Sequence, residues 1–108
     1  MTVLENEDEL YSSIKKEDIV ILQFGEASCG PCHDICDKIT AFCRSHPKIK
    51  FIYIPVEKFP KMSALMNVFT VPYVSVYVKG KMSFYACGCF SLLEIFQRTE
   101  RYEELISE

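Results

Sequence analysis

The feature that most constrains this chain is Cys29-Gly30-Pro31-Cys32, which follows an apolar run and precedes a helical pattern. The run, Ile19 to Phe24, has the length of a strand and no polar alternation, as expected for a strand buried on both faces of a sheet. Residues Gly30 to Ser45 carry apolar side chains at three- to four-residue spacing, and a proline in the first turn costs no helical hydrogen bond. The motif therefore lies at a strand-to-helix junction, which predicts an α/β fold.

The spacing and position of the two cysteines indicate redox chemistry. Cys29 lies at the helix N-terminus, where unpaired N–H groups and the helix dipole favour a thiolate, the species that attacks disulfides. Cys32 lies one turn further in and should be more buried and harder to ionise. We predict Cys29 as the nucleophile and Cys32 as the resolving thiol. Zinc sites use the same spacing, so an inert or metal-bound pair stays open as an alternative.

Length and charge narrow the class of protein. The chain has 108 residues, enough for one domain over 1–108 with a core that needs no disulfide staples. Its net charge is −3 and it has no basic patch, so we predict no nucleic-acid partner. No apolar stretch reaches membrane-spanning length, and residues 1–9 are polar and acidic, unlike a signal peptide. We expect a cytoplasmic protein with no membrane partner, whose six cysteines are mostly reduced.

Periodicity and turn residues predict the remaining elements. Helices are expected from Asn6 or Glu7 to about Lys16, from Lys61 to Val68 and from Ser91 to Ile106. Strands are expected from Ile49 to Val56, Tyr73 to Val78 and Met82 to Ala86, the last two forming a hairpin around Lys79-Gly80-Lys81. Residues expected to face the core are Leu10, Ile14 and, as a further candidate, Tyr11 in the first helix, and Leu92, Ile95, Phe96, Tyr102 and Leu105 in the last. The order gives three layers, α/β/α, around a mixed sheet of four to five strands.

This element order, with C-G-P-C at the first strand-helix junction, resembles the thioredoxin family over nearly the whole chain. Val71-Pro72 precedes a strand, Gly80 falls at the hairpin turn and Gly88 follows the last strand, each at the family's spacing. The resemblance implies a thioredoxin fold and a monomeric protein-disulfide reductase that cycles Cys29–Cys32. It implies no bound cofactor, and electrons from a reductase that the sequence does not identify. It also implies a cis Pro72 that presents the backbone of Val71 to a substrate; a trans proline is the alternative.

The chain departs from the family at positions around the motif. Ser28 replaces the usual Trp before the first cysteine, and Gly25 stands where a further Trp is common. Gln23 replaces the buried Asp, Tyr53 its Lys partner, and Asp37 the proline that kinks the helix. Because an amide cannot exchange a proton, the acid-base helper of the resolving thiol is missing. Water or the Tyr53 hydroxyl is then the substitute, or Gln23 only satisfies a buried hydrogen bond.

The rim around the cysteines is expected to contact substrate. The substrate-binding candidates are Ser28, Gly30, Pro31, Val71, Pro72 and Gly88, and Gly25 and Val56 complete the rim. Loss of a large flat Trp makes this rim smaller, which favours fewer protein partners.

His33 follows the second cysteine. It would favour a thiolate when protonated, or it is simply a solvated side chain.

Four cysteines lie outside the motif. Cys36 and Cys43 fall on the inward stripe of the helix and act as small apolar residues. Cys87 is expected to end its strand inward, whereas Cys89 is expected to be exposed as a possible extra redox partner. Our principal prediction includes no metal. One alternative is a metal-binding or redox-sensing module that uses the motif with Cys36 and, as a fourth ligand, Cys89. The other is an interaction module that keeps the fold without turnover.

Overall fold

The apolar run before the cysteine motif forms the central strand of a five-stranded mixed sheet. The computed structural model describes residues 1–107. Its elements in chain order are β1 (Thr2–Val3), α1 (Glu7–Lys16), β2 (Ile19–Gly25), α2 (Gly30–Arg44), β3 (Ile49–Pro55), α3 (Pro60–Leu65), β4 (Tyr73–Val78), β5 (Lys81–Cys87) and α4 (Leu92–Ser107). The strands lie in the order β1-β3-β2-β4-β5. The pairs β1–β3 and β2–β3 are parallel, and β2–β4 and β4–β5 are antiparallel.

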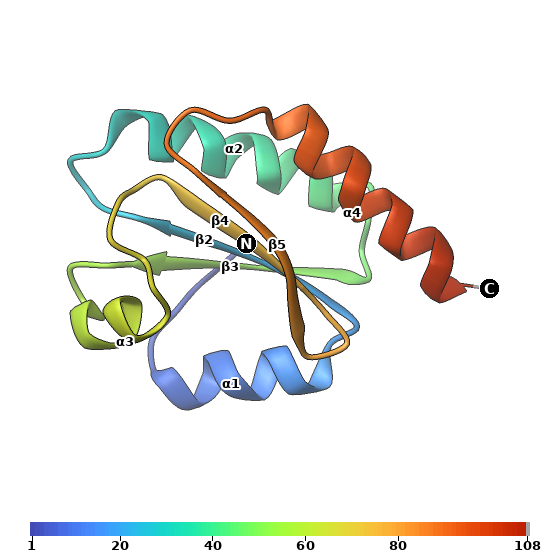
Figure 1. Cartoon of the computed structure of the whole chain (residues 1–108), viewed down its shortest axis with the longest axis horizontal. Helices are drawn as coiled ribbons and strands as arrows, with labels where there is room; N and C mark the ends of the chain where they lie inside the picture. The colour runs from blue at the N-terminus through green and yellow to red at the C-terminus, as the bar shows by residue number, and fades with distance from the viewer. Residues whose placement is uncertain (108) are drawn as a thin grey trace.

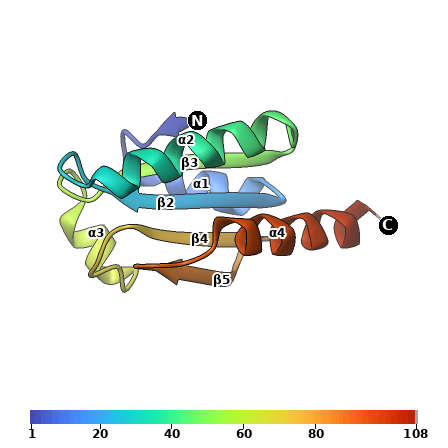
Figure 2. The same ribbon diagram turned by 90° about the horizontal axis from the view of Figure 1, so that it is seen from above.

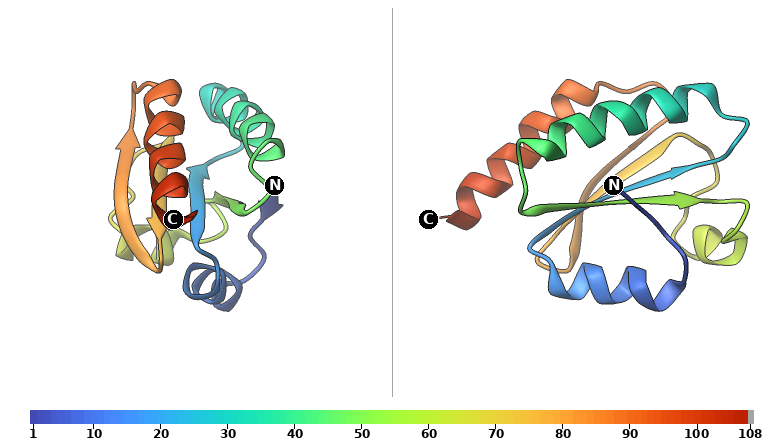
Figure 3. Two further views of the ribbon diagram at one scale, coloured as in Figure 1. Left: turned by 90° about the vertical axis from the view of Figure 1, so that its right-hand side faces the viewer. Right: turned by 180° about the vertical axis from the view of Figure 1, so that it is seen from behind.

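Helices cover both faces of this sheet, which explains why its central strand is apolar except for Gln23. Helices α1 and α3 lie on one face and α2 and α4 on the other (Figures 1 and 2). Figure 3 shows the two helix pairs from the end of the sheet and from behind. All seven residues of β2 are buried, as predicted for a strand with helices on both sides. The predicted α/β/α architecture is confirmed.

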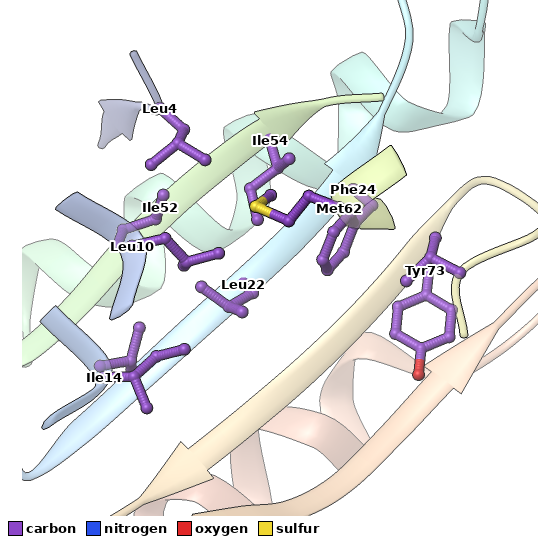
Figure 4. Close-up of a cluster of buried hydrophobic side chains, with 11 residues drawn as sticks. Leu4, Leu10, Ile14, Leu22, Phe24, Ile52, Ile54, Met62 and Tyr73 are labelled. Atoms are coloured by element: carbon purple, nitrogen blue, oxygen red, sulfur yellow. The ribbon is translucent and has the colours of Figure 1, made fainter. Parts of the chain in front are cut away.

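Two apolar clusters fill the space between the sheet and the helices. The cluster under α1 and α3 includes Leu4, Leu10, Ile14, Leu22, Phe24, Ile52, Ile54, Met62 and Tyr73 (Figure 4). The cluster under α2 and α4 includes Ile19, Ile21, Ile39, Ile49, Phe51, Val74, Val76, Phe84 and Ile95. Alternate residues of β2 enter one cluster and then the other, so β2 is fixed from both faces. The loop that follows it therefore starts from a rigid position.

Several predicted boundaries differ from the structure. The strand β1 was not predicted, because two residues carry no periodic signal; Thr2 pairs with Ile52 of β3. Helix α3 ends at Leu65 rather than Val68, since Asn67 has a positive φ of 64°, which does not continue a helix. The hairpin turn is as predicted, with Lys79 and Gly80 at φ values of 52° and 82°.

Two residues proposed for the core are exposed. Tyr11 is 50 % exposed, because Leu10 and Ile14 one helical turn apart already form the buried stripe of α1. Leu105 is 53 % exposed, since the last turns of α4 extend past the end of the sheet (Figure 1). Tyr102 and Ile106 of the same turns pack against the core instead. Further back on α4, Thr99 is buried, and its hydroxyl donates to the Ile95 carbonyl at 2.7 Å.

Candidate active site

Cys29 and Cys32 form a disulfide at the start of α2, with 5.3 Å between their Cα atoms. Cys29 is the N-cap of the helix, and its Sγ accepts a hydrogen bond from the Cys32 backbone N–H at 3.2 Å. Cys29 is partly exposed, whereas Cys32 is fully buried. The predicted asymmetry is therefore confirmed. The sulfur that a partner can reach is the one toward which a helix N-terminal amide points, so reduction leaves Cys29 placed to ionise.

Hydrogen bonds hold the loop between β2 and α2. The N–H of Cys29 donates to the Glu26 carbonyl at 3.0 Å, and the Ser28 hydroxyl donates to the Glu26 carboxylate at 3.3 Å. The Ala27 N–H donates to Glu57 Oε2 at 2.9 Å, and this bond lowers the pKa of the Glu57 carboxyl. Sequence reasoning missed Glu57. The available signal was its position just after β3, because neighbouring parallel strands end at the same edge of a sheet.

His33 is exposed and turns back toward the loop. Its Nε2 lies 3.1 Å from the Ala27 carbonyl oxygen, and a carbonyl only accepts, so Nε2 carries the proton and donates. The interpretation of His33 as a solvated side chain is therefore closer to the structure. The His33 ring contacts the backbone at Ala27, two residues before Cys29.

Gln23 of β2 contacts the backbone of the buried cysteine, Cys32. It is fully buried, and its Nε2 donates to the Cys32 carbonyl at 2.7 Å. Its Oε1 has no partner among residues 1–107. An unpaired buried acceptor costs about 1–3 kcal/mol. Gln23 thus satisfies one buried hydrogen bond and keeps an unpaired acceptor, and its amide cannot take up a proton from Cys32.

Tyr53 occupies the space above Gly25. It pairs with Gln23 in the β2–β3 register. A Cβ atom on Gly25 would lie 2.5 Å from the Tyr53 hydroxyl oxygen and 3.0 Å from the Cys32 Cβ. The phenol and the buried cysteine are therefore neighbours across Gly25. Gly25 is itself buried, so the prediction that it belongs to the exposed rim was wrong; the Tyr53 ring fills the volume that a larger residue would need.

Tyr53 keeps its proton near neutral pH. Burial raises the pKa of its phenol, and the nearby Glu57, Cys36 and Glu26 add to that rise. A neutral phenol can donate a hydrogen bond but carries no negative charge. The site thus has a neutral donor and a neutral amide, where the family resemblance implies a carboxylate and an ammonium.

A groove borders the motif on the side of α4. The Val71-Pro72 peptide is cis, which confirms that prediction, and the Pro72 carbonyl accepts the Gly88 N–H at 3.1 Å. This bond ties the proline loop to the loop after β5. Residues that line the groove, of about 580 Å³, include Pro31, Ile35, Pro72, Gly88, Cys89 and Phe90. Ser28 and Gly30 are exposed outside this lining, and Val71 is half-buried.

The four other cysteines are free and fall into two classes. Cys36 and Cys43 are half-buried against the cluster under α2 and α4, and burial raises the pKa of both thiols, that of Cys43 to about 11. Cys87 and Cys89 are exposed. The prediction that Cys87 faces inward was wrong, because β5 is the edge strand and Cys87 is its last residue.

The alternative of a metal site at these thiols finds no support in the geometry. Within residues 1–107, no three His, Cys, Asp or Glu side chains lie close enough together to hold a metal ion. The Cys36 sulfur instead lies 3.0 Å from the sulfur of Met1.

Among residues 1–107, no helix is long and apolar enough to cross a membrane.

Comparison with known proteins agrees with this geometry. The family model for thioredoxin matches residues 1–100. The chain belongs to the thioredoxin family. It is 28% identical to thioredoxin-2 of Pyricularia oryzae over 83 residues, which cover 75% of this chain and 48% of that protein. It is 27% identical to mitochondrial thioredoxin-3 of Saccharomyces cerevisiae, over 75% of this chain and 61% of that one. The match thus spans about half to two thirds of these relatives.

Solved thioredoxin structures share the fold over their whole length. A thioredoxin of Plasmodium falciparum superposes with a TM-score of 0.83 at 22% identity, covering 91% of this chain and 98% of that one. Thioredoxin 1 of Thermosipho africanus gives 0.76 at 28% identity, covering 82% and 99%. The thioredoxin fold is therefore established for this family member, with the disulfide at its first strand-helix junction.

Proposed function

We propose that this chain is a thiol–disulfide oxidoreductase that reduces protein disulfides by cycling Cys29 and Cys32 between dithiol and disulfide. The observation that carries the proposal is the disulfide at the helix N-terminus, with the reachable sulfur of Cys29 facing the Cys32 amide. Membership of the thioredoxin family supports the same reaction.

The reaction has two exchange steps. The Cys29 thiolate attacks one sulfur of the substrate disulfide, and the second substrate sulfur leaves and takes a proton from solvent. Cys32 then loses its proton and attacks Cys29 Sγ, which breaks the mixed disulfide and releases the first substrate sulfur as a thiol. Two electrons have moved to the substrate, and Cys29–Cys32 is a disulfide again. A reductase must return two electrons, and its identity is open.

The surroundings of the pair suit a polypeptide substrate. Pro72 lines the groove together with Pro31 of the motif, and in this proposal an extended chain pairs with the backbone of the preceding Val71. Ser28, Gly30, Pro31 and Gly88 complete the exposed contact surface in this proposal. We further propose a cytoplasmic, monomeric protein. The four free cysteines support a reducing compartment, although one relative in the comparison is mitochondrial.

The proposal is tested by reduction of insulin with dithiothreitol as the electron source. Wild-type protein should accelerate the reaction, and Cys29→Ser should lose the acceleration. Cys43→Ser is the matched control, since that thiol is half-buried and its pKa is raised to about 11. An inactive wild type that still folds would favour the interaction module over the enzyme.

A trapping variant gives a second test. Cys32→Ser should hold a substrate on Cys29 as a stable mixed disulfide, because the resolving thiol is gone. Cys89 lines the adjacent groove, so the variant is also made with Cys89→Ser. Capture that improves only in the double variant would make Cys89 a working third thiol.

A further inference from the structure

Two exposed thiols flank one glycine at the end of β5. Cys87 is the last residue of the strand, Cys89 follows Gly88, and both cysteines are free and exposed. They differ in this from Cys36 and Cys43, which are half-buried. Among the free cysteines, these two are therefore the ones that a dissolved disulfide can reach from outside.

The backbone between these two thiols is compatible with a bond between them. The chain bends at Gly88 and Cys89, and Gly88 has a φ of 72°, in the left-handed region. Two residues in sequence span roughly 7 Å when extended and less at a bend. A disulfide needs roughly 4.4–6.8 Å between its Cα atoms. Nothing lies within 4 Å of the position of a Cβ on Gly88, so the loop has room to adjust.

The pair also lies at the edge of the candidate active site. The Gly88 N–H donates to the Pro72 carbonyl, and Cys87 pairs with Tyr73, the residue after that proline. Cys89 lines the groove together with Pro31, which lies inside the cysteine motif. Oxidation of Cys87 and Cys89 would therefore alter a loop that lines the groove beside the cysteine motif.

We propose that Cys87 and Cys89 form a second dithiol–disulfide pair, which is oxidised by low-molecular-weight disulfides. The Cys89 thiolate attacks such a disulfide, forms a mixed disulfide and releases one small thiol. Cys87 then loses its proton and attacks Cys89 Sγ, which closes the Cys87–Cys89 bond and releases the second small thiol. Two electrons pass from the pair to the small disulfide, and a thiol reductant reverses the reaction. This pair does not depend on the proposed function of Cys29 and Cys32.

The test uses a variant without the first pair, Cys29→Ser/Cys32→Ser, in mixtures of reduced and oxidised glutathione. The remaining thiols are alkylated and mapped after trypsin cleavage, which places both cysteines in the peptide of residues 82–98. We expect two of the four thiols to be lost together as the buffer becomes oxidising. The peptide should then be two hydrogen atoms lighter and carry neither an alkyl group nor glutathione. Wild-type protein mapped in the same way checks that the result does not depend on folding of the variant.

Two added substitutions in that background separate the possible outcomes. With Cys87→Ser, Cys89 should keep a glutathione adduct in the oxidising mixtures, because no neighbouring thiol displaces the glutathione. With Cys43→Ser, closure of the pair should be unchanged. A lasting glutathione adduct on Cys89 while Cys87 is present would overturn the proposal, as would alkylation of both thiols at every buffer ratio. Because the first pair is absent, neither result bears on whether Cys29 and Cys32 reduce proteins.

Discussion

Replacement of Gly25 by alanine tests the close approach of Tyr53 to the buried cysteine. The added Cβ would lie 2.5 Å from the Tyr53 hydroxyl oxygen, 3.0 Å from the Cys32 Cβ and 3.1 Å from a carbon of the Tyr53 ring. Cys32 is held by the disulfide and by the first turn of α2, so the phenol must move. Overpacking of this kind costs about 1–3 kcal/mol in the free energy of unfolding.

The Tyr53 hydroxyl should account for most of this cost. In a Tyr53→Phe background the nearest atom is gone, and the two remaining contacts of 3.0 and 3.1 Å are tight but need only small shifts. We therefore expect Gly25→Ala to cost less than half as much there, which is a coupling of about 1 kcal/mol between neighbouring sites. Gly30→Ala is the matched control, since nothing lies within 4 Å of its Cβ position. That variant should be neutral or slightly more stable, because alanine favours a helix.

The assay is urea unfolding of the oxidised proteins, with the wild type and the three variants of the cycle compared at constant m-value. A change in the m-value would show that the unfolded or native state had changed in compactness, and the double-mutant cycle would then be repeated thermally. The reasoning fails if Gly25→Ala costs less than about 0.5 kcal/mol, the usual range of harmless substitutions. It also fails if the cost is equal with and without the Tyr53 hydroxyl.

Three further predictions concern the groups around the disulfide. Gln23→Asp should lower stability by about 1–3 kcal/mol, because a carboxylate cannot donate to the Cys32 carbonyl. It should also change the rate of mixed-disulfide resolution more than the rate of initial attack in single-turnover kinetics. If both rates stay within about twofold of the wild-type rates, position 23 takes no part in proton transfer. In the reduced protein, alkylation of Cys29 should show an inflection below the ordinary thiol value of about 8.5, measured as rate against pH. The hydrogen bond from the Ala27 N–H lowers the pKa of the Glu57 carboxyl below 4.5. The stability that this bond adds to the folded protein is therefore fully present above pH 4.5 and is lost as the pH falls through the lower pKa of the folded state. Hydrogen exchange at that amide, corrected for its intrinsic rate, should rise over this acidic range, and a flat profile would show that the bond does not form.

Periodicity alone predicted the elements that carry the site. The run at Ile19–Phe24, apolar except for Gln23, requires cover on both faces of a strand, and the structure gives it helices on both. The spacing of the two cysteines and a proline in the first turn predicted a helix that starts at the motif, with Cys29 reachable and Cys32 buried. These are local signals, because each depends on residues within one or two turns of chain.

Contacts between distant segments were harder to predict. Leu105 and Cys87 have the residue types of a core, yet both are exposed, since α4 runs past the sheet and β5 lies at its edge. Where an element ends relative to its neighbours depends on how the elements pack, and the pattern of a single element does not contain that information.

The sequence by itself determined the fold, the position of the cysteine pair and which of its two sulfurs is exposed. Only the tertiary structure decided what surrounds the pair. Parallel pairing of β2 with β3 places Tyr53 over Gly25 and beside Cys32, and it places Glu57 against the Ala27 amide. These residues lie about thirty positions apart in the chain, at separations of 28 and 30. The physical reason is that strand register, set by burial on both faces, fixes which distant side chains share one site.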